Sequence, residues 1–212
     1  MTQPTPQKPI MLYGFKLSGH SHRAESMLRL LQLPYEYREV NLRGGEQKSE
    51  TFLKLNPFGT VPVIDDNGTV IADSAAILVY LATTYEPARR WLPREAAQAA
   101  QVQRWLSVAQ GPVYNGPAMA RMVKLFGAPA DYERCKAIAS SLFSVLENHL
   151  ASEDFLVGER PTIADVAVYS YIAVSADGGL PLSDYGAIRS WVARLEALPH
   201  FEPMPGSDRN AV

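Results

Sequence analysis

Cysteine, long apolar runs and surplus charge of one sign are all scarce in this sequence. The 212 residues include one cysteine, Cys135, which excludes an internal disulfide framework and any CxxC site. The longest apolar runs fall far short of the roughly 18 residues that a membrane-spanning helix needs. With 20 basic and 22 acidic residues, the chain lacks the basic surface typical of nucleic-acid-binding proteins. A lone cysteine suits a reducing compartment and the first residues lack the apolar core of a signal peptide, so we expect a cytoplasmic protein.

Apolar residues make up 47% of the chain, which is enough for a substantial core. At about 150 residues per domain, the length fits one large domain or two small ones. A chain of this size buries about 70% of its extended surface, so it needs no disulfide or metal to fold.

The first half alternates β-prone and helical segments. Asn67-Gly68 lies between two β-prone runs, and this dipeptide favours a tight hairpin because both residues readily adopt positive φ. The expected segments are a strand at 10–15, a helix around 24–31 that Pro34 stops, a strand at 35–40, a helix at 49–55, strands at 61–64 and 70–71, and a helix from Ser74. The predicted order is βαβ, a short helix, then ββα.

The second half has helical periodicity and no strand pattern. Pro87 and Pro93 mark a linker between the two halves, and the prolines near the start indicate a disordered tail. We therefore predict four segments: a tail at 1–8, an α/β domain at 9–84, a linker at 85–93 and an all-α domain at 94–212, whose end from Phe201 onward is mostly tail.

Pro62 is unusual because it stands inside a β-prone run, where proline cannot donate a ladder hydrogen bond. It could be an ordinary edge-strand proline. Alternatively, a cis Val61–Pro62 bond could turn the Val61 backbone outward, where its N–H and C=O would bind an extended peptide.

Asp73 and Ser74 stand at the start of the next predicted helix. Ser74 could simply cap that helix with its side chain. The free N–H groups and the dipole at a helix N-terminus also attract a carboxylate, and the neighbouring Asp73 carboxylate suits an ammonium. A γ-glutamyl group carries both charges on one carbon, so this pair is a candidate binding site for it.

Two motifs of the first half carry a family resemblance. Residues 56–63 (NPFGTVPV) and 73–78 (DSAAIL) resemble the glutathione-binding half of soluble glutathione S-transferases, and residues 162–165 (TIAD) resemble a helix start in the second domain of that family. The resemblance spans about residues 10–203 and is strongest to bacterial, serine-type members of the phi, theta or zeta kind. It implies a thioredoxin-like first domain, an all-helical second domain and a homodimer.

The same resemblance implies how glutathione would bind. The Val61 backbone before a cis Pro62 would pair with the cysteinyl part, and Thr60 departs from the lysine or glutamine that relatives often have there. The implied glutathione-binding residues are Gln47, Lys48, Thr60, Val61, Pro62, Asp73 and Ser74. Glutathione would be a co-substrate, with no tightly bound cofactor and no metal.

A hydroxyl donor at the sulfur would favour the thiolate of glutathione, whose thiol is only slightly ionised at neutral pH. Ser18 matches the serine of zeta-like members, counting back from Arg23. Ser21 and Tyr13 are alternatives, and either serine could instead cap the first helix. His20 and His22 are expected to be loop residues or modest contributors to a positive site, and Cys135 a buried structural cysteine.

The acceptor site is the least defined part of the prediction. Helix-spaced aromatic and methionine side chains are usually core, but methionines also form adaptable apolar surfaces. Arg121 could bind an anionic group. The candidates for the acceptor pocket are Trp105, Tyr114, Met119, Arg121 and Met122. Thr162 and Asp165 form a predicted capping box, a folding device, whose loss through Asp165→Ala would cost about 1 kcal/mol or more.

These observations favour a cytoplasmic, homodimeric glutathione transferase that activates the thiol with Ser18 and attacks a small hydrophobic electrophile, as in detoxification. A glutathione-dependent isomerase, peroxidase or disulfide reductase on the same scaffold is an alternative. So is a non-catalytic binding module, since a fold does not fix a function.

Overall fold

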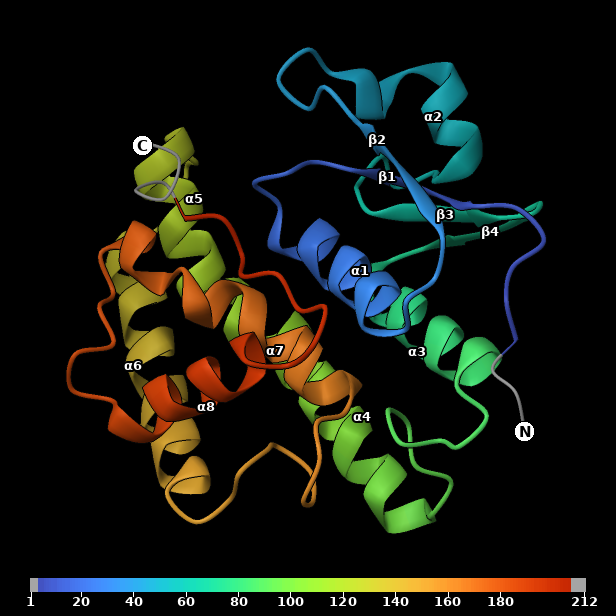
Figure 1. The fold of residues 1–212 in the computed structure, drawn as a ribbon. Coiled ribbons are helices and arrows are strands. Elements are labelled where there is room, and N and C mark those ends of the chain that lie inside the picture. Colours follow the sequence, from blue (N-terminus) through green and yellow to red (C-terminus); the bar gives the residue numbers. More distant parts are fainter. Residues whose placement is uncertain (1–3, 207–212) are drawn as a thin grey trace. The chain divides into compact units, whose positions relative to one another are not determined.

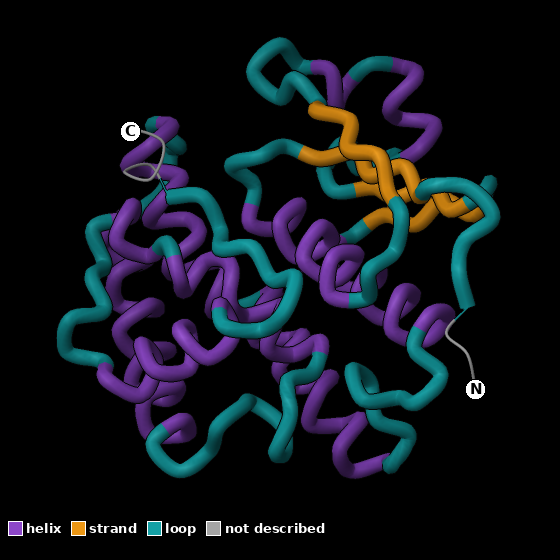
Figure 2. The backbone as a smooth tube through the Cα atoms, in the orientation of Figure 1, coloured by secondary structure: helices purple, strands orange, loops and turns teal. Residues whose placement is uncertain are grey.

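The computed structural model describes residues 4–206, and the chain divides between Leu92 and Pro93 into two compact units. Figure 2 shows that the strands gather in the first unit, whereas the second is built from helices and loops. The expected α/β unit followed by an all-helical unit is confirmed. The predicted limits of tail and linker stay predictions. Residues 1–3 of the expected N-terminal tail and 207–212 of the expected C-terminal tail lie outside the described range.

A four-stranded mixed sheet forms the centre of the first unit (Figure 1). Its spatial order is β2-β1-β3-β4, with β1 and β2 parallel and the other two pairings antiparallel. The strands are β1 (Ile10–Gly14), β2 (Tyr35–Glu39), β3 (Val63–Asp66) and β4 (Thr69–Ala72). Asn67 and Gly68 have φ of 53° and 94°, as the predicted tight hairpin requires.

Helices cover both faces of this sheet, with α2 on one face and α1 and α3 on the other (Figure 1). Phe52 of α2 packs with Val40 and Val63 on the first face, and Tyr13 adjoins that cluster. Because side chains alternate along a strand, Leu12 and Ile64 face the opposite way, toward α1 and α3. The helices of this unit are α1 (Gly19–Leu30), the short 3₁₀ helix η1 (Glu46–Lys48), α2 (Glu50–Leu55) and α3 (Ser74–Tyr85).

The first helix, α1, starts at Gly19, earlier than predicted, so His20 and His22 lie in a helix and not in a loop; its end at Leu30 is within one residue of the prediction. Pro34 was expected to stop it, but α1 ends at Leu30 and Gln32 takes a left-handed φ of 52°. The N–H of Leu33 then returns to the carbonyl of Leu28, which closes the helix end. The backbone therefore turns before the proline is reached.

The second unit is a helical bundle. Its elements are α4 (Ala96–Gln110), the π-type turn η2 (Tyr114–Ala118), α5 (Met119–Phe126), α6 (Tyr132–Leu150), α7 (Ile163–Ala173), the 3₁₀ turn η3 (Ser175–Gly178) and α8 (Gly186–Glu196). Helix α7 is buried along nearly its whole length, so it forms the centre of the bundle. The segment after α8 is not simply a tail, because Phe201 and Met204 are buried.

The predicted capping box at the start of α7 is present. Thr162 Oγ1 accepts from the N–H of Ala164 at 3.2 Å, and Asp165 Oδ2 accepts from the N–H of Thr162 at 2.8 Å. Asp165 does more than predicted: its Oδ1 also accepts from the N–H of Leu156 at 2.9 Å and from Trp191 Nε1 at 3.0 Å. One buried carboxylate thus ties α7 to the preceding loop and to α8.

Candidate functional site

Ser18 stands at the N-terminal end of α1, where the sequence analysis places the thiol-activating hydroxyl. Its backbone is extended, with φ of −85° and ψ of 117°, and its Oγ accepts from the N–H of Ser21 at 3.3 Å. Ser18 is half-buried. It therefore caps a helix of 12 residues, whose N-terminal dipole favours an anion near its first turn. A serine at this position can cap the helix and can also donate to a thiolate. The role of Ser18 in catalysis therefore stays a prediction.

The two alternative hydroxyls are held by other parts of the first unit. Ser21 is buried, and its Oγ accepts from the N–H of Phe15 at 3.1 Å. The Tyr13 ring packs edge-on against Phe52 at 6.5 Å between centroids, and the guanidinium of Arg38 lies 5.5 Å from the Tyr13 ring. Both side chains thus have structural contacts in the first unit, and their role as alternatives to Ser18 stays a prediction.

A polar cluster joins the first turn of α1 to the start of α3. Arg23 Nη1 lies 2.9 Å from His20 Nδ1 and 3.3 Å from Ser74 Oγ. His20 Nδ1 also lies 2.9 Å from Ser74 Oγ. Burial, and then the nearby Arg23 charge, lower the pKa of His20 from 6.5 to about 3. His20 is therefore a neutral imidazole at physiological pH, and Arg23 supplies the charge of the cluster.

Asp73, rather than Ser74, caps α3. Its Oδ1 accepts from the N–H groups of Ala75 at 2.8 Å and Ala76 at 3.0 Å, so the suggestion that Ser74 caps this helix is wrong. Asp73 has a φ of 78°, a rare backbone conformation for a residue with a side chain. Asp73 is exposed and Ser74 is buried. An anionic side chain and a helix N-terminus thus adjoin, which is the chemistry required for an amino-acid headgroup.

The Val61–Pro62 peptide is cis, as the resemblance implies. The loop before it is braced by Asn56, whose Nδ2 donates to the Thr60 carbonyl at 2.8 Å and to Thr60 Oγ1 at 3.0 Å. Asn56 Oδ1 accepts from the N–H of Phe58 at 3.1 Å. Thr60 therefore bonds within its own loop, and Val61 is half-buried just before β3.

Gln47 and Lys48 lie in η1, which adjoins the same loop. Lys48 Nζ donates to the carbonyl of Phe58 at 3.0 Å, and Gln47 Nε2 donates to the carbonyl of Leu42 at 3.3 Å. Gly59, with a φ of 58°, allows this close approach, since a Cβ there would lie 2.7 Å from the Gln47 carbonyl oxygen. The structure thus brings both predicted carboxylate-binding residues beside the segment that leads to Val61.

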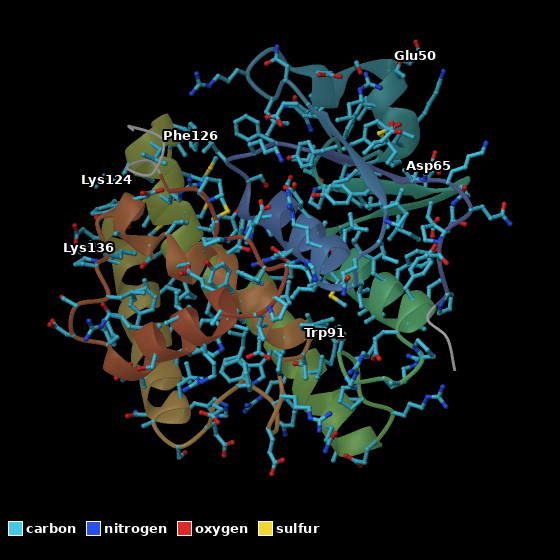
Figure 3. The ribbon with its side chains drawn as sticks, in the orientation of Figure 1. Glu50, Asp65, Trp91, Lys124, Phe126 and Lys136 are labelled. Carbon is cyan, nitrogen blue, oxygen red and sulfur yellow. The ribbon has the colours of Figure 1, made fainter. Side chains whose placement is uncertain are left out.

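The five acceptor-pocket candidates have different surroundings in the second unit. Trp105 is buried, with its ring 5.2 Å from that of His149, whereas Met119 is half-buried. Tyr114 and Met122 are 41% and 40% exposed, and their contact with a ligand stays a prediction. Lys124, labelled in Figure 3, lies further along α5 with its ammonium 4.4 Å from the Tyr132 ring.

Arg121 makes a buried ion pair. Its Nε lies 2.9 Å from Asp177 Oδ2, and both side chains are almost inaccessible to solvent. Asp177 lies in η3, so the pair fastens α5 to that turn. Arg121 therefore has a structural partner, and its binding of an anionic substrate group stays a prediction.

Within residues 4–206, no group of three or more His, Cys, Asp or Glu side chains is placed to hold a metal ion. None of the described helices is both long and apolar enough to cross a membrane. Cys135 is buried, and burial raises the pKa of its thiol.

Comparisons with known proteins agree with this arrangement. Residues 17–84 match the family model for the N-terminal domain of glutathione S-transferases, and residues 116–199 match the model for the C-terminal domain. The chain belongs to the glutathione S-transferase family. It is thus related to enzymes, and its two units correspond to the two domains of the family.

Individual relatives cover almost the whole chain. A protein of Vibrio cholerae named "Probable maleylacetoacetate isomerase" is 32% identical over 202 residues, which are 91% of this chain and 93% of that protein. The crystal structure of a glutathione S-transferase from Pseudomonas fluorescens has a TM-score of 0.86 and 34% identity, covering 92% of this chain and 98% of the other. A glutathione transferase homologue from Drosophila mojavensis with bound glutathione has a TM-score of 0.81 and 31% identity, covering 90% and 89%.

Three residues of this glutathione S-transferase family member have site contacts that we did not predict. His20 is predicted to be a loop residue or a modest contributor to a positive site, Arg23 is used to locate Ser18, and Asn56 is part of the motif at 56–63. A polar i, i+3 pair at a helix start, such as His20 and Arg23, does share one face of the helix. An Asn before proline also commonly bonds its own turn, as Asn56 does. Neither pattern identifies the partner, which lies far away in the sequence.

Proposed function

We propose that this protein is a glutathione transferase that binds reduced glutathione in its first unit and transfers the tripeptide thiolate to a small electrophile. The observation that carries this proposal is the cluster of Arg23, His20 and Ser74, which links the first turn of α1 to the start of α3. Ser18, the candidate for the sulfur, caps α1, and Ser74, a candidate for the γ-glutamyl group, opens α3.

Each of the three parts of glutathione would have its own pair of contacts in the first unit. The exposed Asp73 carboxylate suits the γ-glutamyl ammonium, and Ser74 at the α3 N-terminus suits its carboxylate. The backbone N–H and C=O of Val61 suit the cysteinyl residue. Gln47 and Lys48 suit the glycine carboxylate, for which Lys48 would exchange its present bond to a backbone carbonyl.

Catalysis would consist of holding the sulfur as a thiolate. The thiol loses its proton to solvent, and the Ser18 hydroxyl and the N-terminal dipole of α1 stabilise the sulfur anion. The sulfur electron pair then forms a bond to an electrophilic carbon, which either releases a leaving group or takes up a proton elsewhere. Thiolate stabilisation and proximity supply the rate enhancement.

The partners of this activity are also part of the proposal. Tyr114, Met119 and Met122 are our candidates for contact with a hydrophobic electrophile, and Trp105 and Arg121 complete that set. We propose a cytoplasmic homodimer. Phe58 is our candidate for the partner surface, because at 83% it is the most exposed of the large hydrophobic residues among those that the structure describes.

The test is the ultraviolet absorbance of bound glutathione thiolate as a function of pH, for the wild type and for Ser18→Ala. We expect a bound thiol pKa well below that of free glutathione, and a rise toward the free value in the variant. Ser49→Ala is the matched control, because Ser49 caps α2 in the same way and accepts from the N–H of Phe52 at 3.2 Å. A lowered pKa that Ser18→Ala leaves unchanged would assign the role to Ser21 or Tyr13. Absence of glutathione binding would refute the proposed function.

A second candidate is a glutathione-dependent isomerase, supported by the name of the Vibrio cholerae relative and by the serine-containing loop before α1. The same thiolate would add to a double bond, allow rotation and then leave again, so glutathione would be regenerated. Turnover of maleylacetoacetate with no net consumption of glutathione would favour this activity. Stoichiometric loss of free thiol with a model electrophile, and no isomerisation, would favour the transferase.

A further inference from the structure

We propose that His20 is a positioning residue that sets the Ser74 hydroxyl and the Arg23 guanidinium for the α-carboxylate of a γ-glutamyl ligand. This inference rests on the proposed function, because it concerns the same glutathione site. It adds a specificity role for a residue of α1 that bonds to the start of α3, 54 residues further along the chain.

The donors and acceptors of the cluster can be assigned from their chemistry. A guanidinium can only donate, so the 2.9 Å contact with Arg23 Nη1 requires His20 Nδ1 to be the acceptor. The imidazole proton must then be on Nε2. The pKa of His20, lowered to about 3, is in agreement with this neutral tautomer. Arg23 and Ser74 are both buried, so neither group exchanges its partners freely with bulk water.

Two donors compete for the same nitrogen. Arg23 Nη1 and Ser74 Oγ each lie 2.9 Å from His20 Nδ1, which has a single in-plane lone pair. The 3.3 Å contact from Arg23 to Ser74 Oγ is longer and weaker. When a carboxylate arrives at the α3 N-terminus, the Ser74 hydroxyl rotates to donate to it, and Arg23 keeps the histidine nitrogen. Arg23 Nη1, fixed by its bond to His20, still donates to the Ser74 oxygen, so His20 positions the serine through the guanidinium.

The proposed role of His20 predicts different effects for asparagine and glutamine at position 20, although both side chains are polar. In Asn, the atoms attached to Cγ occupy the place of Nδ1, so His20→Asn keeps an acceptor for Arg23 and Ser74. In Gln, the polar atoms lie one bond further out, near the place of Nε2. His20→Leu keeps bulk but removes the acceptor altogether. We therefore expect the Asn variant to retain ligand binding and the Gln and Leu variants to lose it.

The experiment is calorimetric titration of each variant with glutathione and with an analogue in which a hydrogen replaces the γ-glutamyl α-carboxylate. In the wild type we expect glutathione to bind at least about tenfold more tightly than the analogue, as a charge-assisted hydrogen bond allows. His20→Leu and His20→Gln should reduce that preference to near unity, and His20→Asn should restore most of it. His22→Asn is the matched control, since the His22 ring contacts Ser26 of the same helix.

The possible outcomes separate the two proposals. If the wild type does not bind glutathione, the proposed function itself fails. If the wild type binds and prefers glutathione, but His20→Leu keeps the same preference, the positioning role of His20 is refuted and the proposed function stands. Equal weakening of both ligands by His20→Leu indicates a general structural effect and also overturns the inference.

Discussion

Replacement of Asp165 by alanine should be among the most destabilising single substitutions in the second unit. The buried carboxylate accepts from three N–H groups, those of Leu156, Thr162 and the Trp191 indole, at 2.8–3.0 Å. Asp165→Ala leaves all three buried donors without their acceptor. Each unsatisfied buried donor costs about 1–3 kcal/mol, so with partial relaxation we expect a loss of about 3–5 kcal/mol in the free energy of unfolding. That is a large share of the roughly 5–15 kcal/mol that stabilises a typical domain.

The assay is urea denaturation followed by far-ultraviolet circular dichroism, with Asp131→Ala as the matched control. Asp131 caps α6, but it is exposed and accepts from a single N–H, that of Arg134, at 3.1 Å. The control should lose about 1 kcal/mol. Asp165→Asn keeps one acceptor oxygen, so its loss in the free energy of unfolding should lie between those of Asp131→Ala and Asp165→Ala. This variant gives a measurement even if Asp165→Ala does not fold. A loss for both Asp165 variants no greater than that of Asp131→Ala would refute this reasoning.

Three further predictions concern other parts of the chain. Glu147→Ala should cost about 1–2 kcal/mol in the same urea assay, because Glu147 of α6 accepts from the N–H groups of Ala187 and Ile188 and so caps α8; an unchanged midpoint would contradict this. His20 should make the wild type less stable in acid: below pH 6.5 the unfolded chain gains a proton that the folded chain refuses until about pH 3. Between pH 6.5 and about pH 3, the free energy of unfolding of the wild type should therefore fall, relative to that of His20→Asn, by up to about 1.4 kcal/mol per pH unit. If the stabilities of the two proteins instead change in parallel with pH, His20 is not held neutral in the folded state. Phe58→Ser should shift the protein from dimer to monomer in light scattering; an unshifted dimer would show that the exposed ring is outside the interface.

The fold could be predicted because its local signals agree with one another. The Asn67-Gly68 hairpin, the alternating elements of the first half and the Thr162–Asp165 capping box each depend on neighbours in the sequence, and all three are present. Element ends were less predictable. The end of α1 is set by a left-handed Gln32, which has no strong propensity signal, and not by Pro34.

Contacts between distant residues could not be predicted in the same way. The cap of α3 required a choice between two adjacent residues, and only the backbone of Asp73, with its positive φ, decides that its carboxylate reaches the helix N–H groups. The pairing of His20 with Ser74, and of Arg121 with Asp177, joins side chains more than 50 residues apart. Residue type and helical spacing indicate that such polar groups need partners, but they do not identify the partner.

At the start of α3, the helix cap is made by Asp73, and Ser74, the candidate for the ligand carboxylate, is not part of it. Asp73 alone provides the cap, so Ser74 is not needed to hold the helix together. Substitution at position 74 can therefore alter what this end of the helix recognises while the helix itself remains intact. During divergence, a chain with this arrangement could change or abandon its ligand through one mutation and still fold. Among related chains with different ligands, we accordingly expect the residue at position 74 to vary more often than the residue at position 73.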